Sequence, residues 1–264
     1  MARKTYDEAN IAAIAERIRA NTGGNSTYNT KEMAGGVDEV YAAGIAEGKQ
    51  AEYDAFWDEV QNYGKTDYYP FAFCADAFTK ETFKPKYDIR PTNAQNMFSY
   101  MNYTSRTGNT LDLVEHLDSL GVVLDFSKAT SVQGLCSYNK MFTRMGVLDF
   151  SKAANLNTAF DYASAIKTID KLILKSTGTA SFSNTFRGAK ALEDITIEGV
   201  IAGNVSFQDC PLTRASIESI ISHLSDTTSG LTVTFKKTAK EAAFTADEWA
   251  ALIATKSNWT ISLV

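Results

Sequence analysis

The sequence has little of what most enzymes and membrane proteins need. Its 264 residues include only two histidines, three cysteines and four prolines. No apolar run approaches the roughly 18 residues of a membrane span, and no apolar segment follows the polar N-terminus, so neither membrane insertion nor a signal peptide is predicted. No metal-ligand spacing, nucleophile motif or complete phosphate-binding loop is present. We therefore expect no catalytic residue, no metal and no cofactor.

The net charge and the cysteine content narrow the possible classes of protein further. The chain carries 26 basic and 31 acidic residues, a net charge of −5, which is not the electrostatic footprint of a nucleic-acid-binding protein. Cys74, Cys136 and Cys210 are widely spaced and odd in number, which favours buried free thiols in a reducing compartment. Hydrophobic residues make up 44% of the chain, enough for a sizeable core.

What the sequence does have is an internal repeat. The hexapeptide Leu-Asp-Phe-Ser-Lys-Ala occurs at residues 124–129 and again, 24 residues later, at 148–153. Residues 172–174 and 195–197 follow at similar spacing and show the alternation of short, half-buried strands. The turns that recur between these segments each contain one phenylalanine, which we expect to fill the core. The best-matching turns contain Phe160, Phe186 and Phe207.

The repeat predicts stacking, because one strand and one turn cannot bury an apolar face alone. We expect a solenoid over residues 63–212. Residues 1–62 are predicted to be helical and to anchor the protein, either as a homo-oligomer or packed back on their own domain. Residues 213–264 are expected to form a cap, with a helix over 213–224, strands over 231–235 and 259–263, and a capping box at 245–248.

The turns of the pattern Ala-Phe-x-x-Cys/Ala-x-x-Leu, each followed by a short Leu-x-Ile-like strand, resemble BspA-like leucine-rich repeats over about residues 70–212. The regular Asn of the conventional consensus is absent. The resemblance implies an α+β fold: a helical N-terminal segment, an irregular leucine-rich-repeat (BspA-like) solenoid and a C-terminal helix/strand cap.

Both ends of the chain carry a second resemblance. Residues 11–24 and 28–34 are similar to the opening of minor structural proteins from phages and prophages of Gram-positive bacteria. Residues 211–261 are similar to the closing segment of leucine-rich-repeat proteins encoded in such genomes. This resemblance implies a non-enzymatic tail, baseplate or fibre component, made in the host cytoplasm and carried in the virion. Its partners would be other virion proteins and a bacterial surface glycan or protein used for host attachment.

Two surfaces are candidates for binding. Outward residues of successive strands would form one column, and aromatic side chains in the loops could stack on sugars. The predicted strand-face column is Asp125, Asp149, Ile173 and Thr196. The predicted loop aromatics are Tyr100, Tyr103, Tyr138 and Tyr162.

Two alternatives remain at this point. A bacterial adhesion or protein-interaction repeat protein would need an export route that the sequence does not show. A solenoid glycan hydrolase would need two carboxylates facing one cleft, and the alignment offers Asp125 and Asp149 on adjacent strands about 4.8 Å apart.

Overall fold

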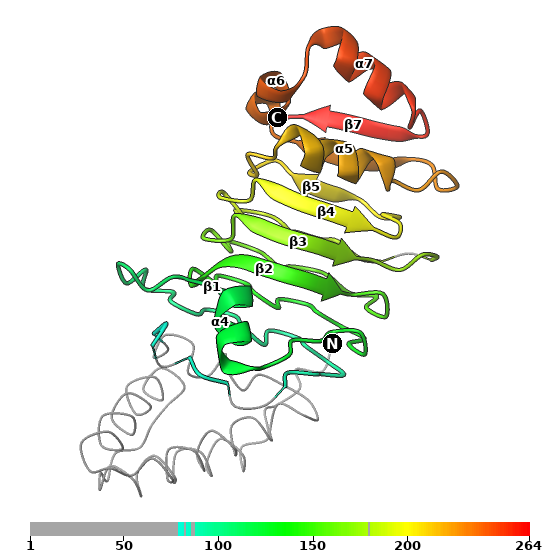
Figure 1. The fold of residues 1–264 in the computed structure, drawn as a ribbon. Coiled ribbons are helices and arrows are strands. Elements are labelled where there is room, and N and C mark those ends of the chain that lie inside the picture. The colour runs from blue at the N-terminus through cyan, green and yellow to red at the C-terminus, as the bar shows by residue number, and fades with distance from the viewer. Residues whose placement is uncertain (1–78, 82, 86–87, 179) are drawn as a thin grey trace, which may run out of the picture.

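The computed structural model describes residues 79–81, 83–85, 88–178 and 180–264 (Figure 1). The helical segment predicted over residues 1–62, its role in oligomerisation and the boundary at residue 63 lie outside the described residues. Within the described part of the chain, no helix is both long and apolar enough to cross a membrane.

The described strands form two sheets, and every strand pair in them is parallel. The first sheet has the order β1 (Leu111–Asp112), β2 (Phe142–Asp149), β3 (Thr168–Ile173) and β4 (Asp194–Glu198). The second has the order β5 (Val205–Phe207), β6 (Leu231–Phe235) and β7 (Trp259–Leu263). In Figure 1 the β7 arrow runs opposite to those of β2, β3 and β4.

Four helices lie between consecutive strands of the described residues. They are α4 (Leu113–Leu120) between β1 and β2, α5 (Arg214–Ser222) between β5 and β6, and α6 (Lys237–Ala243) and α7 (Ala246–Ala254) between β6 and β7. Parallel strands cannot be joined by a tight hairpin, so each pair needs a crossover that returns the chain to the starting edge. Helices provide that crossover at three places here.

The expected fold class, α+β with a leucine-rich-repeat solenoid, is therefore wrong. The described residues form an α/β fold of two parallel sheets with helices between strands. The 24-residue period suggested one uninterrupted series of similar coils, but α4 lies between β1 and β2, and α5 closes the edge of β4. Ser216 and Ser219 of α5 accept hydrogen bonds from the backbone N–H groups of Ile195 (2.9 Å) and Ile197 (2.8 Å). These contacts satisfy an edge strand that would otherwise pair with another strand.

Three of the four predicted strand segments nevertheless coincide with strands of the structure. Residues 148, 172 and 197 fall in β2, β3 and β4, where Leu148 is the register partner of Leu172, and Leu172 that of Ile197. Leu124 instead forms an isolated parallel bridge with Ile89.

The elements predicted after residue 212 are confirmed. The helix over 213–224 is α5, and the strands over 231–235 and 259–263 are β6 and β7. The capping box is also present at the start of α7, where Thr245 Oγ1 accepts from the Glu248 N–H and the Glu248 carboxylate accepts from the Thr245 N–H.

The core contains a stack of buried phenylalanine rings, which we call the phenylalanine stack. Its ring centroids are 5.4 Å apart between Phe160 and Phe186, 4.6 Å between Phe186 and Phe207, and 6.0 Å between Phe207 and Phe235. All four side chains are fully buried. The turn phenylalanines predicted from the repeat therefore fill the core, as expected.

The prediction for the cysteines is confirmed at two positions. Cys136 and Cys210 are free and buried, and burial raises the pKa of each thiol well above its ordinary value. They pack as small apolar groups. Cys74 lies outside the described residues.

Candidate functional site: an exposed tyrosine ladder

The two aspartates of the predicted strand-face column accept hydrogen bonds from backbone N–H groups two residues further along the chain. Asp125 Oδ1 accepts a hydrogen bond from the Ser127 N–H and Asp149 Oδ1 accepts one from the Ser151 N–H, both at 2.9 Å. A short carboxylate side chain that bonds the backbone two residues on stabilises a turn. The repeated Asp-Phe-Ser sequence is thus explained by turn formation after the strand.

The electrostatics of Asp125 do not suit it to the general-acid role in a glycan hydrolase. Hydrogen bonds from Ser127 and the nearby Arg90 guanidinium lower the pKa of Asp125, with Arg90 Nη1 3.2 Å from Asp125 Oδ2. A glycosidase needs one carboxyl group with a raised pKa to protonate the leaving oxygen. Asp125 does not meet that requirement.

The column does not continue to Thr196. Ile173 is the register partner of Asp149, as predicted, but its partner on β4 is Glu198. Thr196 lies between Ile195 and Ile197, which are the register partners of Ile169 and Leu172, so it stands two residues before Glu198 and outside the row. Charged residues elsewhere on these strands pair with one another. Arg144 makes a bidentate contact with Asp170 (2.8 and 2.7 Å), and Lys171 Nζ lies 3.0 Å from Glu198 Oε2.

The predicted loop aromatics, in contrast, are brought together in one row, which we call the tyrosine ladder. The Tyr100 and Tyr138 rings stack at 5.2 Å with planes 6° apart, and the Tyr138 and Tyr162 rings stack at 5.1 Å with planes 12° apart. Tyr103 meets Tyr100 and Tyr138 edge to face, at 5.5 and 5.9 Å. Tyr100 and Tyr103 are each 47% exposed and Tyr162 is 40% exposed. Large aromatic groups gathered at a surface in this way are a typical feature of an interaction site.

The backbone under the ladder is in an uncommon conformation. Tyr100, Tyr138 and Tyr162 have φ angles of 63°, 57° and 53°, in the left-handed region. For a residue with a Cβ this costs about 1–2 kcal/mol. Gly188, four residues after another left-handed residue and next in the row, has φ 68°, and a Cβ there would lie 2.6 Å from the Tyr162 ring. The row ends at this glycine, where a Cβ would force the Tyr162 ring to shift.

Hydrogen bonds between neighbouring turns hold the strained residues in place. The N–H groups of Tyr100, Tyr138 and Tyr162 donate to the carbonyls of Ser137, Asp161 and Arg187, at 2.8, 2.7 and 2.6 Å. The conformational cost at each of these tyrosines is therefore offset by a backbone hydrogen bond to the neighbouring turn. Residues held in this conformation concentrate at functional sites.

Each end of the ladder carries a cation. Lys140 Nζ lies 5.0 Å from the centre of the Tyr103 ring and donates to the Tyr103 carbonyl at 2.9 Å. The Arg187 guanidinium lies 5.2 Å from the centre of the Tyr162 ring. It also makes a bidentate pair with the buried Asp161 at 2.7 and 2.6 Å, and these hydrogen bonds raise the pKa of Arg187.

The expected stacking of sugars does not suit the Tyr138 and Tyr162 rings. A sugar ring packs against the face of an aromatic ring, but the Tyr138 faces are covered by Tyr100 and Tyr162, and Arg187 lies over Tyr162. The tyrosine ladder presents ring edges and phenol hydroxyls to a partner. Among the described residues, no hydrogen bond of the Tyr103, Tyr138 or Tyr162 hydroxyl is found, so these groups are available to a partner.

Sequence reasoning named the four tyrosines but missed the residues that complete the surface: Lys140, Asp161 and Arg187. Tyr138 and Tyr162 share the 24-residue offset of the repeated hexapeptide, a signal that they occupy equivalent positions. No comparable signal marks Lys140 or Arg187, since their contacts depend on how neighbouring turns stack.

No group of three or more potential metal ligands occurs in the described parts of the chain. His116 lies in α4, where its Nε2 contacts the Phe83 carbonyl, and His223 follows α5 as its C-cap residue. No protein-family model, no curated protein and no solved structure matches this chain. The BspA-like and phage resemblances thus stay predictions.

Proposed function

We propose that this chain is a non-enzymatic interaction protein whose tyrosine ladder binds another protein. The observation that carries the proposal is the row of exposed tyrosines held in left-handed backbone conformation, where glycine would be less strained. Tyrosine and arginine are enriched in protein interfaces, because their large, rigid side chains bury much area at a low entropic cost.

The chemistry of the row indicates what the partner presents. The open phenol hydroxyls can donate hydrogen bonds, and Lys140, which hydrogen-bonds Tyr103 and Ser105, has no carboxylate partner among the described residues. Arg187 is already neutralised by Asp161. A partner surface with carboxylates or backbone carbonyls would complement these donors. The resemblance of residues 11–34 to phage minor structural proteins, and of residues 211–261 to repeat proteins encoded in such genomes, supports a partner among virion subunits of the tail, baseplate or fibre.

Site-specific photo-crosslinking in the producing cells tests the proposal. A photoreactive phenylalanine analogue at Tyr162 is expected to link the chain to one virion protein. The matched control position is Val147 on β2, which is 55% exposed. Equal labelling from both positions, or absence of the chain from purified particles, would contradict the proposal.

A further inference from the structure

The end of the molecule formed by β7 and α7 has an open sheet edge. In Figure 1 these two elements lie at the opposite end of the molecule from α4. β7 is the last strand of its sheet and pairs with β6 on one side, and no other strand of the described residues continues the sheet on its other side. A strand with one unpaired edge is a template for pairing with another chain.

The hydrogen bonds that end the β6–β7 pair show which backbone groups point to the open edge. The Val264 N–H donates to the Phe235 carbonyl at 3.1 Å, and the Val264 carbonyl accepts from the Lys237 N–H at 2.6 Å. Successive residues of a strand direct their N–H and C=O groups to opposite sides of the strand. Ile261 and Leu263 therefore direct both groups away from β6, and neither N–H has a hydrogen-bond partner in the part of the chain that the structure describes.

The edge of β4 shows how this protein closes an edge, and β7 has no such protection. At β4, the Ser216 and Ser219 hydroxyls of α5 accept the N–H groups of the strand. The usual devices that keep an edge from pairing are charged side chains, prolines and bulges. The β7 sequence Trp-Thr-Ile-Ser-Leu contains no charge and no proline, and its register with β6 has no shift. The open edge is therefore suited to pairing.

The side of α7 that faces away from α5 is uncharged as well. Glu248 Oε1 lies 2.8 Å from Arg214 Nη1 on α5, so the Glu248 side of the helix faces α5. With about 3.6 residues per turn, the exposed Ala246 and Ala250 lie on the opposite side, and the exposed Ala254 follows one turn later. Figure 1 shows α7 beyond α5 and β7 beyond β5 in the same direction, so this alanine side and the open edge face the same way.

Four apolar side chains at this end are only partly buried. Leu252 and Ile253 of α7 and Ile261 and Leu263 of β7 pack against the core but stay partly exposed. The core thus reaches the surface beside the open edge. A partner that covered these side chains would remove apolar area from water, which favours association.

We infer that β7 pairs with β7 of a second copy of this chain, antiparallel, about a two-fold axis near Ile261. In this register the Ile261 N–H of each copy donates to the Ile261 carbonyl of the other, and the Leu263 N–H donates to the Trp259 carbonyl of the other. One edge therefore supplies both the donors and the acceptors. The inference goes beyond the proposed function, because no residue of β7 or α7 belongs to the tyrosine ladder.

A second copy is the fitting partner because the edge complements itself on both faces of the sheet. A two-fold axis perpendicular to the sheet keeps the core faces of both β7 strands on one side, where Ile261 meets Ile261 and Leu263 meets Trp259 of the other copy. On the outer face Thr260 stands opposite Ser262, and such hydroxyl pairs stabilise neighbouring strands. No charge of either β7 is desolvated, whereas a charged partner strand would lose its hydration against this uncharged surface.

Size-exclusion chromatography with light scattering on the full chain tests the inference. Ile261→Pro removes the free N–H without removing a hydrogen bond to β6, and proline is tolerated at a strand edge. Ala250→Arg places a long charged side chain between the two α7 helices. Each variant should have half the mass of the parent chain. Ala251→Arg, exposed on the Glu248 side of the same helix, is the matched control and should keep the parent mass.

Two outcomes of this measurement would overturn the inference. A parent chain that has the mass of one copy at about 100 µM would assign the open edge to a different strand. A folded Ala250→Arg variant that keeps the parent mass would place any self-association elsewhere in the chain. Thermal unfolding shows whether each variant is folded.

Disulfide trapping checks the register without a disruptive variant. In the inferred pairing, residues 260 and 262 of the two copies stand opposite each other with Cα atoms about 4.5 Å apart, within the range of a disulfide. Thr260→Cys combined with Ser262→Cys should therefore give a covalent dimer on mild oxidation. Thr232→Cys with Thr234→Cys, their register partners on β6, is the matched control and should not, because β6 has no open edge. Equal cross-linking of both double variants, or none in either, would overturn the inference.

Discussion

Two stacks of aromatic rings form between neighbouring turns and strands of this protein, and they differ in burial and in backbone conformation. The rings of the phenylalanine stack are 4.6–6.0 Å apart and fully buried. The stacked rings of the tyrosine ladder are 5.1 and 5.2 Å apart, but two of the three are at least 40% exposed. Only the ladder places its residues in left-handed conformation.

This difference indicates that the two stacks have different roles. Buried rings remove apolar area from water and stabilise the fold. An exposed ring in a strained conformation recovers less of that free energy and still incurs the conformational cost. The ladder is therefore poorly explained by stability alone, and the predictions below ask whether stability and binding separate between the two stacks.

The largest expected effect is in the phenylalanine stack. Phe186→Ala should lower the free energy of unfolding by about 3–5 kcal/mol, because it removes a buried ring between Phe160 and Phe207 and leaves a cavity. Denaturant unfolding measures the change. Phe186→Leu, which fills most of the volume, is the control and should cost less. A loss below about 1 kcal/mol for the alanine variant would show that this stack does not carry the fold.

A smaller effect is expected where the ladder ends. Gly188→Ala should destabilise the fold by about 1–2 kcal/mol for the left-handed backbone, plus the cost of displacing the Tyr162 ring. Gly178→Ala is the matched control, since its φ is also positive but its Cβ would meet open space. Thermal unfolding of both variants isolates the contact with Tyr162. Equal destabilisation would mean that Gly188 is required only for its backbone.

Within the ladder, stability should change less than in the phenylalanine stack. Tyr138→Gly loses three ring contacts worth about 0.5–1.5 kcal/mol each but relieves about 1–2 kcal/mol of backbone strain. We expect the free energy of unfolding to fall by only about 1–2 kcal/mol while partner binding is lost. A large destabilisation with partner binding retained would show that the tyrosine ladder stabilises the fold and does not bind the partner.

Much of this architecture could be predicted from the sequence, because it depends on local patterns. Alternation located the strands β2, β3 and β4, capping residues located α7, and the repeated turns identified Phe160, Phe186 and Phe207 as core. The four tyrosines, which were predicted to share one surface, do lie together, while their role in binding stays a prediction. These signals are short-range, and each has a direct physical cause.

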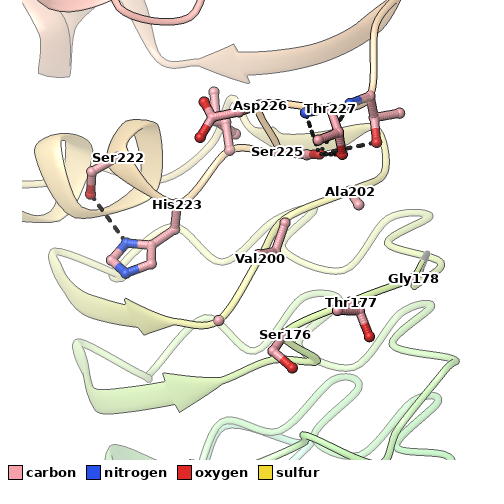
Figure 2. Close-up of a pocket in the computed structure, with 13 residues that line it drawn as sticks. Ser176, Thr177, Gly178, Val200, Ala202, Ser222, His223, Ser225, Asp226 and Thr227 are labelled. Carbon is pink, nitrogen blue, oxygen red and sulfur yellow. Dashed lines mark hydrogen bonds between the residues drawn. The ribbon is translucent and has the colours of Figure 1, made fainter.

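The fold class and the strand column could not be predicted, because they depend on contacts between distant segments. The serines of α5 that close the edge of β4 are indistinguishable in sequence from ordinary surface serines. The register between β3 and β4 leaves no trace in the alternation of residues, yet it places Glu198 and not Thr196 beside Ile173. A pocket of about 550 Å³, drawn in Figure 2, likewise combines loops that follow β3, β4 and α5.

The smallest expected effect lies outside both stacks, in the capping box of α7. Hydrogen bonds from the Thr245 N–H, the Arg214 guanidinium and the Thr245 hydroxyl lower the pKa of Glu248 to about 2. A carboxylate with a lowered pKa stabilises the folded state above its unfolded pKa, and that contribution is lost as the pH falls from about 4.5 toward 2. Thermal unfolding across this window should show a shallower pH dependence for Glu248→Gln than for the parent chain. Identical slopes would contradict the assignment.

The most direct test of the account is hydroxyl-radical footprinting of the tyrosines, comparing the isolated chain with purified particles that contain it. The account predicts that Tyr103, Tyr138 and Tyr162 react readily in the isolated chain and are protected in the particle, while exposed Val147 on β2 reacts equally in both. Tyrosines that remain as reactive in the particle as in the isolated chain would show that the ladder contacts no partner there.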